Sequence, residues 1–489
     1  MKKGNYNCFG TVKGNSDEFA NERKHSNNMP KDFNRDVYAA MHAWKDCCAT
    51  NKVALVVNGA RQIGKTHCIN KYTKEHFDKV YYADFFRKDF RDKAESIPGR
   101  QLTTLQIVET LFPDFEDREG SVIVLDEIQE YADMYNMIRP INRDMSCHLI
   151  VSGSFLGRTL NRGFITPTGD TRTIRMYGLS FPEFLGGLGI RELYDNADLF
   201  GGSDVSVYEQ LRKAFDLYCF IGGYPKVVEQ FLFTQNKELA ESLLEELVSV
   251  VCEETSRYFG EIQDVAKLNR LLNGVANLLV REKRGDLKLT SELGRIVEGT
   301  NKRSITNALH WFWKSGILEP CGRVNDCDPS MITPESLFYF ADLGIANHLY
   351  EQLPVQESNV YGAICENFAY ACIRDMKGVI PKEPCFGTYG PGELDYLFFV
   401  KSGGKVIPIG VEVKGGKDAG NTARELLKNG KIAYLINAKV DTKGGYHENT
   451  FTIPLPLLGK FNIFNYIPKD DVIAHSTQPL LGSHQKSSQ

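Results

Sequence analysis

The chain has 489 residues, more than a single hydrophobic core usually serves, so we expect several domains. Apolar residues make up 42% and charged residues 25%, a composition that excludes a disordered or fibrous protein. The net charge of -4 excludes the basic excess of a dedicated nucleic-acid binder, so any DNA contact has to be local.

The sequence carries no signal for export or membrane insertion. The N-terminal stretch lacks the apolar core of a signal peptide, and no run approaches the roughly 18 apolar residues that span a bilayer. The 12 cysteines show no CxxC pair and no Cys/His cluster at metal-ligand spacing, which favours buried reduced thiols. We therefore expect a cytoplasmic protein without a membrane partner.

Composition and hydrophobic pattern divide the chain into five stretches. Residues 1–33 are polar and predict a flexible N-terminal segment, and residues 469–489 predict a flexible tail. In residues 34–203 short apolar runs alternate with helix-like stretches, which predicts a parallel sheet covered on both faces. Residues 204–335 predict a helical middle, and residues 336–468 a second α/β domain. The expected strands are 53–58, 80–84, 122–126 and 148–152 in the first domain, and 394–400, 406–413 and 433–437 in the last.

A phosphate-binding loop follows the first expected strand. Its glycines let the backbone turn so that its N–H groups face the phosphates, and the following helix presents its positive end to the same anion. Lys65 would reach the β- and γ-phosphates, and Thr66 would ligate magnesium. The sequence therefore predicts an ATPase that binds ATP and Mg²⁺. The eight residues that match the P-loop spacing are Gly59, Ala60, Arg61, Gln62, Ile63, Gly64, Lys65 and Thr66.

An acidic pair closes the strand expected at 122–126. Asp126 is placed to hold the magnesium ion, and Glu127 is placed to polarise the attacking water as a general base. The next strand ends in Ser152, Gly153 and Ser154, whose hydroxyl groups can sense the γ-phosphate or orient the water. Plain loop chemistry is the alternative for this turn.

Three arginines follow that turn. Arg158, Arg172 and Arg175 are each candidates for an arginine finger that neutralises charge in the transition state. The sequence does not choose among them, and a solvated surface position is the alternative for each.

Further motifs stand in a fixed order along the chain. They are the P-loop, LDEIQ at 125–129, the Ser-Gly-Ser turn at 152–154, LSFPEFL at 179–185, GGYP at 222–225, ADLG at 341–344 and ENF at 366–368. In this order and content the chain resembles prokaryotic AAA-type ATPases that carry a C-terminal domain of formerly unknown function, although that family usually has DTGL where this chain has ADLG. The resemblance implies an AAA+/STAND-type P-loop ATPase, a winged helix in the middle and a C-terminal PD-(D/E)xK nuclease-like domain, which has a restriction-endonuclease-like α/β fold.

The stretch 290–318 has the spacing of a helix-turn-helix, with a polar turn around Gly299. Basic residues outnumber acidic ones in residues 281–303, and Arg303 and Asn307 are placed to meet phosphate or bases. The alternative is a helix pair that only packs against the nucleotide domain, with its tryptophans in the core.

A second acidic constellation lies in the last domain. Asp395 opens one expected strand and Glu412 closes the next, so both are candidate oxygen ligands for Mg²⁺. Lys414 lies two residues on, on the same strand face, where it can assist the nucleophile or offset charge. The resemblance adds Glu366 as the upstream acid of this metal site. A basic excess in residues 401–443 would attract phosphate, so we expect a nuclease-like fold and leave cleavage activity open.

Two functions follow from this combination. In the first, ATP drives conformational changes that the helical middle passes to a C-terminal domain that binds or cuts double-stranded DNA. In the alternative, the ATP state controls a protein partner and the C-terminal domain is non-catalytic. A metabolic kinase is disfavoured, because such enzymes rarely need so much chain outside the nucleotide domain.

Overall fold

The computed structural model describes residues 33–97, 101–153, 169–259, 261–281, 288–415 and 421–467. Within these ranges every helix is too short or too polar to span a bilayer. The cysteines in these ranges are free thiols, and most are buried, as the sequence predicts. The segments expected to be flexible at the two ends lie outside the described residues, except for Phe33.

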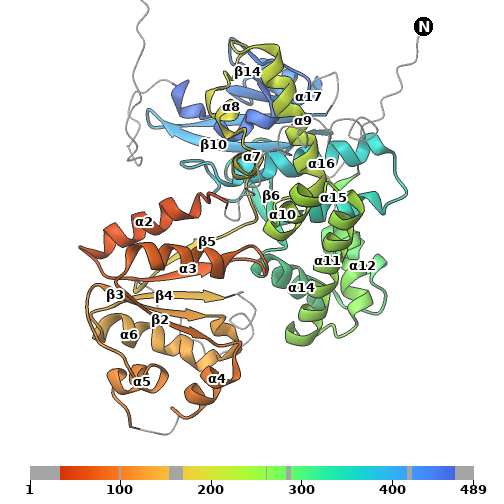
Figure 1. The fold of residues 1–489 in the computed structure, drawn as a ribbon. Helices are drawn as coiled ribbons and strands as arrows, with labels where there is room; N and C mark the ends of the chain where they lie inside the picture. The colour runs from red at the N-terminus through yellow and green to blue at the C-terminus, as the bar shows by residue number, and fades with distance from the viewer. Residues whose placement is uncertain are drawn as a thin grey trace, which may run out of the picture.

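A five-stranded parallel sheet forms the middle layer of the N-terminal domain, with the strand order β2-β3-β4-β1-β5 (Figure 1). The first four strands confirm the expected ones to within one residue at each end. Because β4 lies between β1 and β3, its end stands between the phosphate loop and the acidic pair. The strands are β1 Ala54–Asn58, β2 Lys79–Asp84, β3 Ser121–Asp126, β4 His148–Gly153 and β5 Thr171–Arg175.

Helices cover both faces of this sheet. Side chains alternate along each strand, so Leu55 and Val57 of β1 pack into one core and Ala54 and Val56 into another. The face that bears Leu55 and Val57 is called the first face and the face that bears Ala54 and Val56 the second, and Figure 1 shows helices on both. These helices are α2 Val37–Cys48 and α3 Lys65–His76 on the first face, and α4 Lys88–Glu95, α5 Thr104–Leu111 and α6 Ile138–Asp144 on the second.

Helices make up most of residues 181–374, and α9 to α14 among them lie in residues 204–335, the stretch where the pattern predicts a helical middle. The turn between α13 and α14 contains Gly299 with a φ of +74°, which supplies the left-handed backbone of the expected helix-turn-helix. The helices are α7 Phe181–Leu188, α8 Arg191–Asn196, α9 Val205–Ile221, α10 Pro225–Thr234, α11 Lys237–Phe259, α12 Val265–Leu279, α13 Leu289–Ile296, α14 Lys302–Lys314, α15 Leu343–Glu351 and α16 Glu357–Arg374.

A four-stranded sheet joins the middle to the C-terminal region. The hairpin β6 Leu318–Asn325 and β7 Ile332–Phe340 follows α14, and β6 also pairs in parallel with β8 Cys385–Tyr389. The strand β9 Gly392–Leu394 completes the order β7-β6-β8-β9. The boundary that the sequence pattern places after residue 335 therefore falls inside β7, and strands from both sides of it share one sheet.

The C-terminal sheet has the order β10-β11-β12-β14-β13, and its strands β10, β11 and β12 correspond to the three expected in the last domain. β10 and β11 form an antiparallel hairpin, while β11 and β12 are parallel neighbours with the helix α17 Asn421–Lys428 between them in the chain. The strands are β10 Tyr396–Ser402, β11 Lys405–Lys414, β12 Tyr434–Lys439, β13 Gly445–His447 and β14 Thr450–Pro454.

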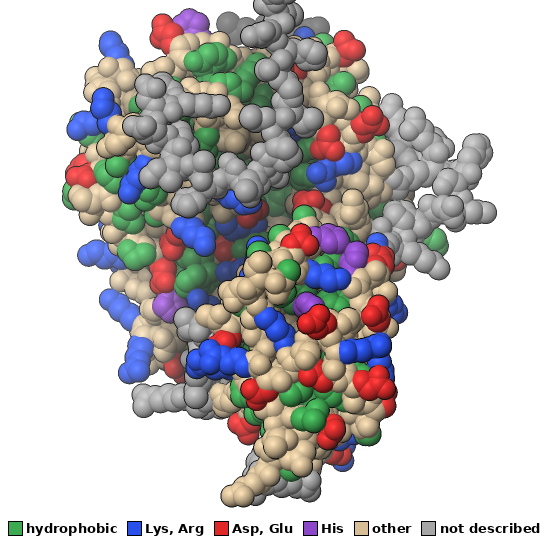
Figure 2. Space-filling view, turned by 90° about the vertical axis from the view of Figure 1, so that its left-hand side faces the viewer, with side chains coloured by type: hydrophobic (Ala, Val, Ile, Leu, Met, Phe, Trp, Pro, Cys, Tyr) green, Lys and Arg blue, Asp and Glu red, His purple; other side chains and the backbone are tan. Residues whose placement is uncertain are grey.

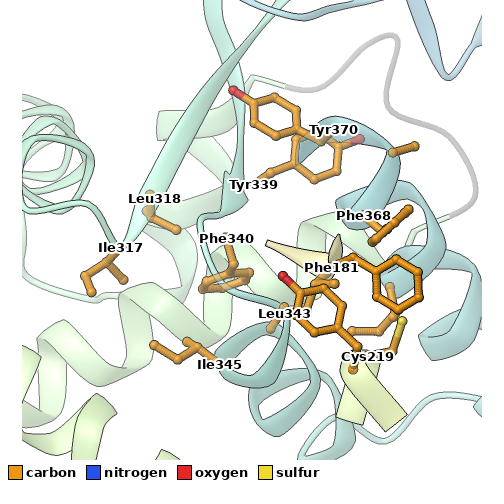
Figure 3. Close-up of a cluster of buried hydrophobic side chains, with 14 of the residues drawn as sticks. Phe181, Cys219, Ile317, Leu318, Tyr339, Phe340, Leu343, Ile345, Phe368 and Tyr370 are labelled. Carbon is orange, nitrogen blue, oxygen red and sulfur yellow. The ribbon is translucent and has the colours of Figure 1, made fainter. Parts of the chain in front are cut away.

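One continuous core connects the sheets and the helices (Figure 3). The ring of Phe181 on α7 packs against Phe215 on α9 and Phe368 on α16, with ring centroids 6.0 and 5.8 Å away. Asp342 ties two of the sequence motifs together, because its carboxylate accepts hydrogen bonds from the N–H groups of Gly344 and Gly223. The ADLG and GGYP motifs thus meet at one buried carboxylate.

Candidate nucleotide site and C-terminal acidic site

The P-loop forms the turn between β1 and α3. Gly59 lies against the backbone of residue 176, where an added Cβ would stand 2.3 Å from the Met176 carbonyl oxygen. Gly64 has a φ of +89° and precedes the first residue of α3, and Gln62 has a φ of +62°. Backbone of this left-handed kind turns successive N–H groups toward one concave side, which is the shape of an anion-binding loop.

The Lys65 amine lies inside this loop. It donates hydrogen bonds to the carbonyl oxygens of Gly59, at 3.1 Å, and Ala60, at 2.8 Å. Burial lowers the pKa of Lys65, while the carboxylates of Glu127 and Asp126 raise it in part. The ammonium group therefore stands between the loop and the acidic pair, where the sequence predicts the β- and γ-phosphates.

Asp126 is the centre of a hydrogen-bond network at the end of β3. Its Oδ2 accepts bonds from Thr66 Oγ1 at 2.7 Å and from Tyr82 Oη at 2.5 Å. Its Oδ1 accepts bonds from Ser152 Oγ and from the N–H of Glu127. Burial and the bond to Asp126 raise the pKa of Tyr82, which keeps the phenol protonated as a donor.

The contact between Thr66 and Asp126 brings together the two residues predicted to hold magnesium. A hydroxyl and a carboxylate are hard oxygen donors of the kind that Mg²⁺ prefers. The hydrogen-bond donors to Asp126 are all neutral, so no cation is bonded directly to this carboxylate and Lys65 acts on it only through space. The residues present therefore fit the predicted ion.

Glu127 begins the short 3-10 helix η1 Ile128–Glu130 with a left-handed backbone, at a φ of +51°. Such a conformation is uncommon for a residue with a side chain, and it is stabilised only by its surroundings. The carboxylate accepts a hydrogen bond at Oε2 from Gln129 Nε2. Gln129 is the last residue of the LDEIQ motif, and its sequence position alone predicts no role for it.

A buried ion pair behind the loop was not predicted from the sequence. Arg35 Nε lies 3.2 Å from Glu183 Oε1, and the two side chains are 6% and 5% exposed. The same guanidinium donates to the carbonyl oxygens of Ile63, at 3.0 Å, and Tyr177, at 2.7 Å. Fixing the Ile63 carbonyl on this side turns the N–H of the same peptide unit, that of Gly64, toward the phosphate side.

The loop also touches the helical middle. Arg61 forms an ion pair with Glu254 of α11, and its guanidinium carbon lies 5.5 Å from the centre of the Phe86 ring. Gly316, in the turn after α14, approaches the loop so closely that an added Cβ would stand 3.0 Å from the Ala60 nitrogen. Two elements of the middle therefore contact the nucleotide loop directly.

The arginine-finger candidates have other contacts or lie outside the described residues. Arg172 donates to the Ala43 carbonyl of α2 at 3.0 Å. Arg175 pairs with Glu319 of β6 at 2.7 Å. Ser154 and Arg158 both fall in residues 154–168, outside the described ranges, so their predicted roles remain predictions.

The C-terminal acidic residues gather around Lys414. Its amine lies 2.8 Å from Glu412 Oε1, as their shared strand face predicts. Burial lowers the pKa of Lys414, but the carboxylates of Asp395, Glu412 and Glu366 raise it above its usual value overall. Asp395, between β9 and β10, accepts a 2.6 Å bond from the Val413 N–H.

This arrangement differs from the predicted three-carboxylate metal site. No group of three or more His, Cys, Asp and Glu side chains in the described ranges is arranged to hold a metal ion. An ammonium group lies among Asp395, Glu412 and Glu366 instead. The residues as placed do not fit a magnesium ion, so we derive no chemical step through one here.

The helix-turn-helix residues are placed in two environments. Arg303 is exposed at the start of α14, whereas the side-chain amide of Asn307 donates to Glu261 at 2.9 Å. Trp311 is buried, as the packing alternative expects, and Trp313 is partly buried. The basic residues at 283 and 284 lie outside the described ranges.

Comparison with known proteins supports the first of these sites. Residues 51–185 match the family model of an AAA domain, and residues 212–357 match a domain of unknown function, DUF8612. No curated protein matches the chain.

Several solved structures are similar at low identity. A Walker-type ATPase of Pyrococcus abyssi is 12% identical with a TM-score of 0.40, over 65% of this chain and 96% of that chain. The Aeropyrum pernix ORC1 protein in complex with DNA is 16% identical with a TM-score of 0.29, over 67% and 95%. The Thermotoga maritima RuvB Holliday junction branch migration motor is 11% identical with a TM-score of 0.27, over 62% and 92%. Similarity at this level carries no argument about ligands or partners.

The family match covers the P-loop, the acidic pair and the end of β4, which are the parts that the structure brings together around Asp126. Residues 51–185 are thus an AAA-type P-loop ATPase domain.

Proposed function

We propose that the chain hydrolyses ATP and uses the nucleotide state to control a DNA-directed C-terminal domain. The observation that carries the proposal is the network at Asp126, which joins the P-loop hydroxyl of Thr66 to the strand end that bears Glu127. Lys65 lies within reach of both parts. The phosphate groups of ATP in the loop would face the ammonium group of Lys65, the oxygens of Thr66 and Asp126, and the candidate base Glu127.

Each residue of the nucleotide site has a distinct task in this proposal. Mg²⁺-bound ATP supplies the phosphoryl group and the charge that has to be neutralised. Lys65, which is bonded to two loop carbonyls, would pair with the phosphates, and Thr66 with Asp126 would hold the metal ion. Glu127 accepts the proton of the attacking water. The Gly64 N–H, fixed by Arg35 through the Ile63 carbonyl, contributes to the cradle.

The helical middle is placed to transmit the nucleotide state. Arg61 is part of the P-loop and Glu254 is part of α11, so a change in the loop alters this ion pair directly. The helix α9 in turn contacts the C-terminal region. Arg212 of α9 pairs with Asp441 after β12. The hydroxyl group of Tyr361 on α16 donates to Asp216 of α9 at 3.1 Å. In this proposal the middle acts as a winged-helix unit between the ATPase domain and the nuclease-like sheet.

Binding of double-stranded DNA is the effector step of the proposal. The basic excess of residues 401–443 and the exposed Arg303 support it. On the face shown in Figure 2, acidic and basic side chains are interspersed, so a DNA site there would have to be local. Cleavage by Asp395, Glu412 and Lys414 would be a further step, and it would require these side chains to take positions other than those in the structure.

The proposal is tested by ATP hydrolysis with and without duplex DNA. Glu127→Gln should lower the turnover number about 100-fold or more, because general-base catalysis contributes that much, while ATP binding persists. Glu119→Gln, an exposed change before β3, is the matched control and should behave as the parent. Equal hydrolysis by the parent and Glu127→Gln would refute the assigned base.

Cleavage requires its own measurement. Duplex DNA is incubated with Mg²⁺ and either the parent or Lys414→Ala. Cleavage by the parent that is lost in the variant supports a nuclease, and equal cleavage by both refutes the assigned role of Lys414.

The arrangement at Lys414 favours a second candidate function. The Lys414 ammonium group is paired with Glu412, and no group of three or more His, Cys, Asp and Glu side chains in the described ranges is arranged to hold a metal ion. Both observations favour a non-catalytic binding domain. The chain would then be an ATP-controlled switch for a protein partner. DNA binding that weakens steeply with salt would count against this candidate, and no binding at low salt would favour it.

A further inference from the structure

The side chain of Gln129 lies next to Glu127, the candidate base, but the proposed hydrolysis gives Gln129 no role. The residue follows Glu127 by two positions, in the short helix η1. Its Nε2 donates to Glu127 Oε2. An ionised carboxylate only accepts hydrogen bonds, so the nitrogen of the amide has to face Glu127 and the amide oxygen has to face away.

The other end of the amide is fixed by the end of β4. A Cβ added to Gly153 would stand 2.3 Å from Gln129 Oε1 and 3.4 Å from its Cδ. The oxygen is buried, and no donor among the described residues reaches it. The amide is therefore wedged between the Glu127 carboxylate and the backbone of Gly153, at the place where β4 separates the P-loop from the acidic pair.

Glu127 needs such a support for geometric reasons. Its side chain has three rotatable bonds, and its left-handed backbone, with a φ of +51°, does not itself direct the carboxylate. The carboxylate nevertheless lies close enough to Lys65 to raise the pKa of that amine. One oxygen bonded to Gln129 leaves the other available to the attacking water.

We propose that Gln129 is the positioning residue for the general base: its amide, braced against Gly153, holds the Glu127 carboxylate at the γ-phosphate. This inference rests on the proposed ATP hydrolysis and deepens it. It concerns the orientation of a group that acts only in the chemical step, so it predicts a loss of turnover without a loss of ATP binding.

The first test replaces Gln129 by methionine, which keeps the length and volume of the side chain but donates no hydrogen bond. We expect the turnover number to fall about 10-fold or more, because misplacing a catalytic group by about 1 Å costs up to about 100-fold. The KM for ATP and the dissociation constant of Mg²⁺-ATP, measured with Glu127→Gln and the parent as references, should change less than about twofold. A purely structural role for the bond would move KM and thermal stability together with turnover.

The second test reaches the same amide from the opposite side. Gly153→Ala places a methyl group where Gln129 Oε1 lies, and the backbone there is not left-handed, so the strand tolerates the change. We expect a fall in turnover comparable to that of Gln129→Met. The matched control is Gly186→Ala in α7, where an added Cβ meets nothing within 4 Å.

The double variant decides between a shared and a separate cause. If Gly153 acts through Gln129, the double variant should be no slower than Gln129→Met alone, since the hydrogen bond to Glu127 that the second change would disturb is already lost. Multiplying effects, or turnover of Gln129→Met equal to that of the parent, would overturn the inference while leaving hydrolysis by the parent intact. A parent without ATP hydrolysis would instead overturn the proposed function, and this inference with it.

Discussion

The two acidic sites of this molecule differ in what neutralises their carboxylates. Asp126 accepts hydrogen bonds from three hydroxyl groups and one backbone N–H, all of them neutral donors. Glu412 is paired with the ammonium group of Lys414. Hydroxyl donors can reorient around a metal ion without leaving a charge unpaired, whereas an ammonium group has to be displaced. The carboxylate of Asp126 can thus accept a metal ion, whereas the carboxylate of Glu412 is already paired with the ammonium group of Lys414.

The same contrast applies to the ion pairs that support each region. The pair Arg35–Glu183 behind the P-loop is almost completely buried, at 6% and 5% exposure, while Lys414 is 29% exposed beside Glu412. Arg61 and Glu254, which connect the ATPase domain to the middle, lie at 28% and 15%. Glu412 is itself 6% exposed, so the pairs Arg35–Glu183 and Lys414–Glu412 differ in the exposure of the cation. Removing one partner should cost more free energy of unfolding when both partners are buried than when water reaches one of them.

The largest loss of free energy of unfolding is expected on substitution of Arg35. Arg35→Ala should lower the free energy of unfolding by about 3–5 kcal/mol, because it leaves the Glu183 carboxylate buried without its cation. The KM for ATP should rise as well, since the Ile63 carbonyl loses its donor and the loop loses its orientation. Urea unfolding and steady-state ATP hydrolysis measure the two effects.

A surface pair provides the control for that change. Arg191→Ala removes the exposed partner of Asp195 on α8 and should cost less than about 1 kcal/mol. If Arg35→Ala were no more costly than this control, the buried pair would not support the loop.

An intermediate loss of free energy of unfolding is expected on substitution of Lys414. Lys414→Met should lower the free energy of unfolding by about 1–3 kcal/mol, less than full burial would give because the amine is partly exposed. The loss arises because Glu412, Asp395 and Glu366 then repel one another without the ammonium group. Lys405→Met, an exposed change on the same strand, should leave the urea midpoint nearly unchanged. Equal midpoints for both variants would mean that Lys414 does not neutralise the site.

The smallest change in stability is expected between the domains. Glu254→Gln removes the partner of Arg61 and should alter the free energy of unfolding by less than about 1 kcal/mol. Any stimulation of ATP hydrolysis by DNA or by a partner should nevertheless weaken, because the link from the loop to α11 is cut. The neighbouring exposed Glu253→Gln should preserve the stimulation, and a similar loss in both variants would exclude this ion pair as the link.

Motif spacing was sufficient to predict the core of the nucleotide site. Lys65, Thr66, Asp126 and Glu127 follow from local patterns, since a glycine loop and a strand end are each defined by a few consecutive residues. Four strands of the N-terminal sheet and three of the C-terminal sheet were also predictable, because buried strands produce short apolar runs bounded by glycines and charges. These motifs and strands could be predicted because each is encoded by a few consecutive residues. The other strands, including the hairpin β6–β7, were not predicted.

Arg35 could not be predicted in the same way. Its partner Glu183 lies 148 positions away, and no periodicity connects the two. One signal was present: a glutamate inside the apolar run of the LSFPEFL motif has to find a partner if the run is buried. The cation beside Glu412 was visible as Lys414, but its effect on metal binding depends on side-chain placement, which strand periodicity does not give.

The four-stranded sheet β7-β6-β8-β9 affects the order in which the protein can fold during synthesis. The strands of the N-terminal sheet are complete once residue 175 has left the ribosome, so that sheet has all its parts early. The hairpin β6–β7 has to wait for β8, which begins at residue 385, before its inner edge is paired. Until then β6 presents unpaired backbone groups that can bind another strand. The hairpin therefore keeps an open edge until the start of the C-terminal region has been synthesised, although its own residues come earlier in the chain.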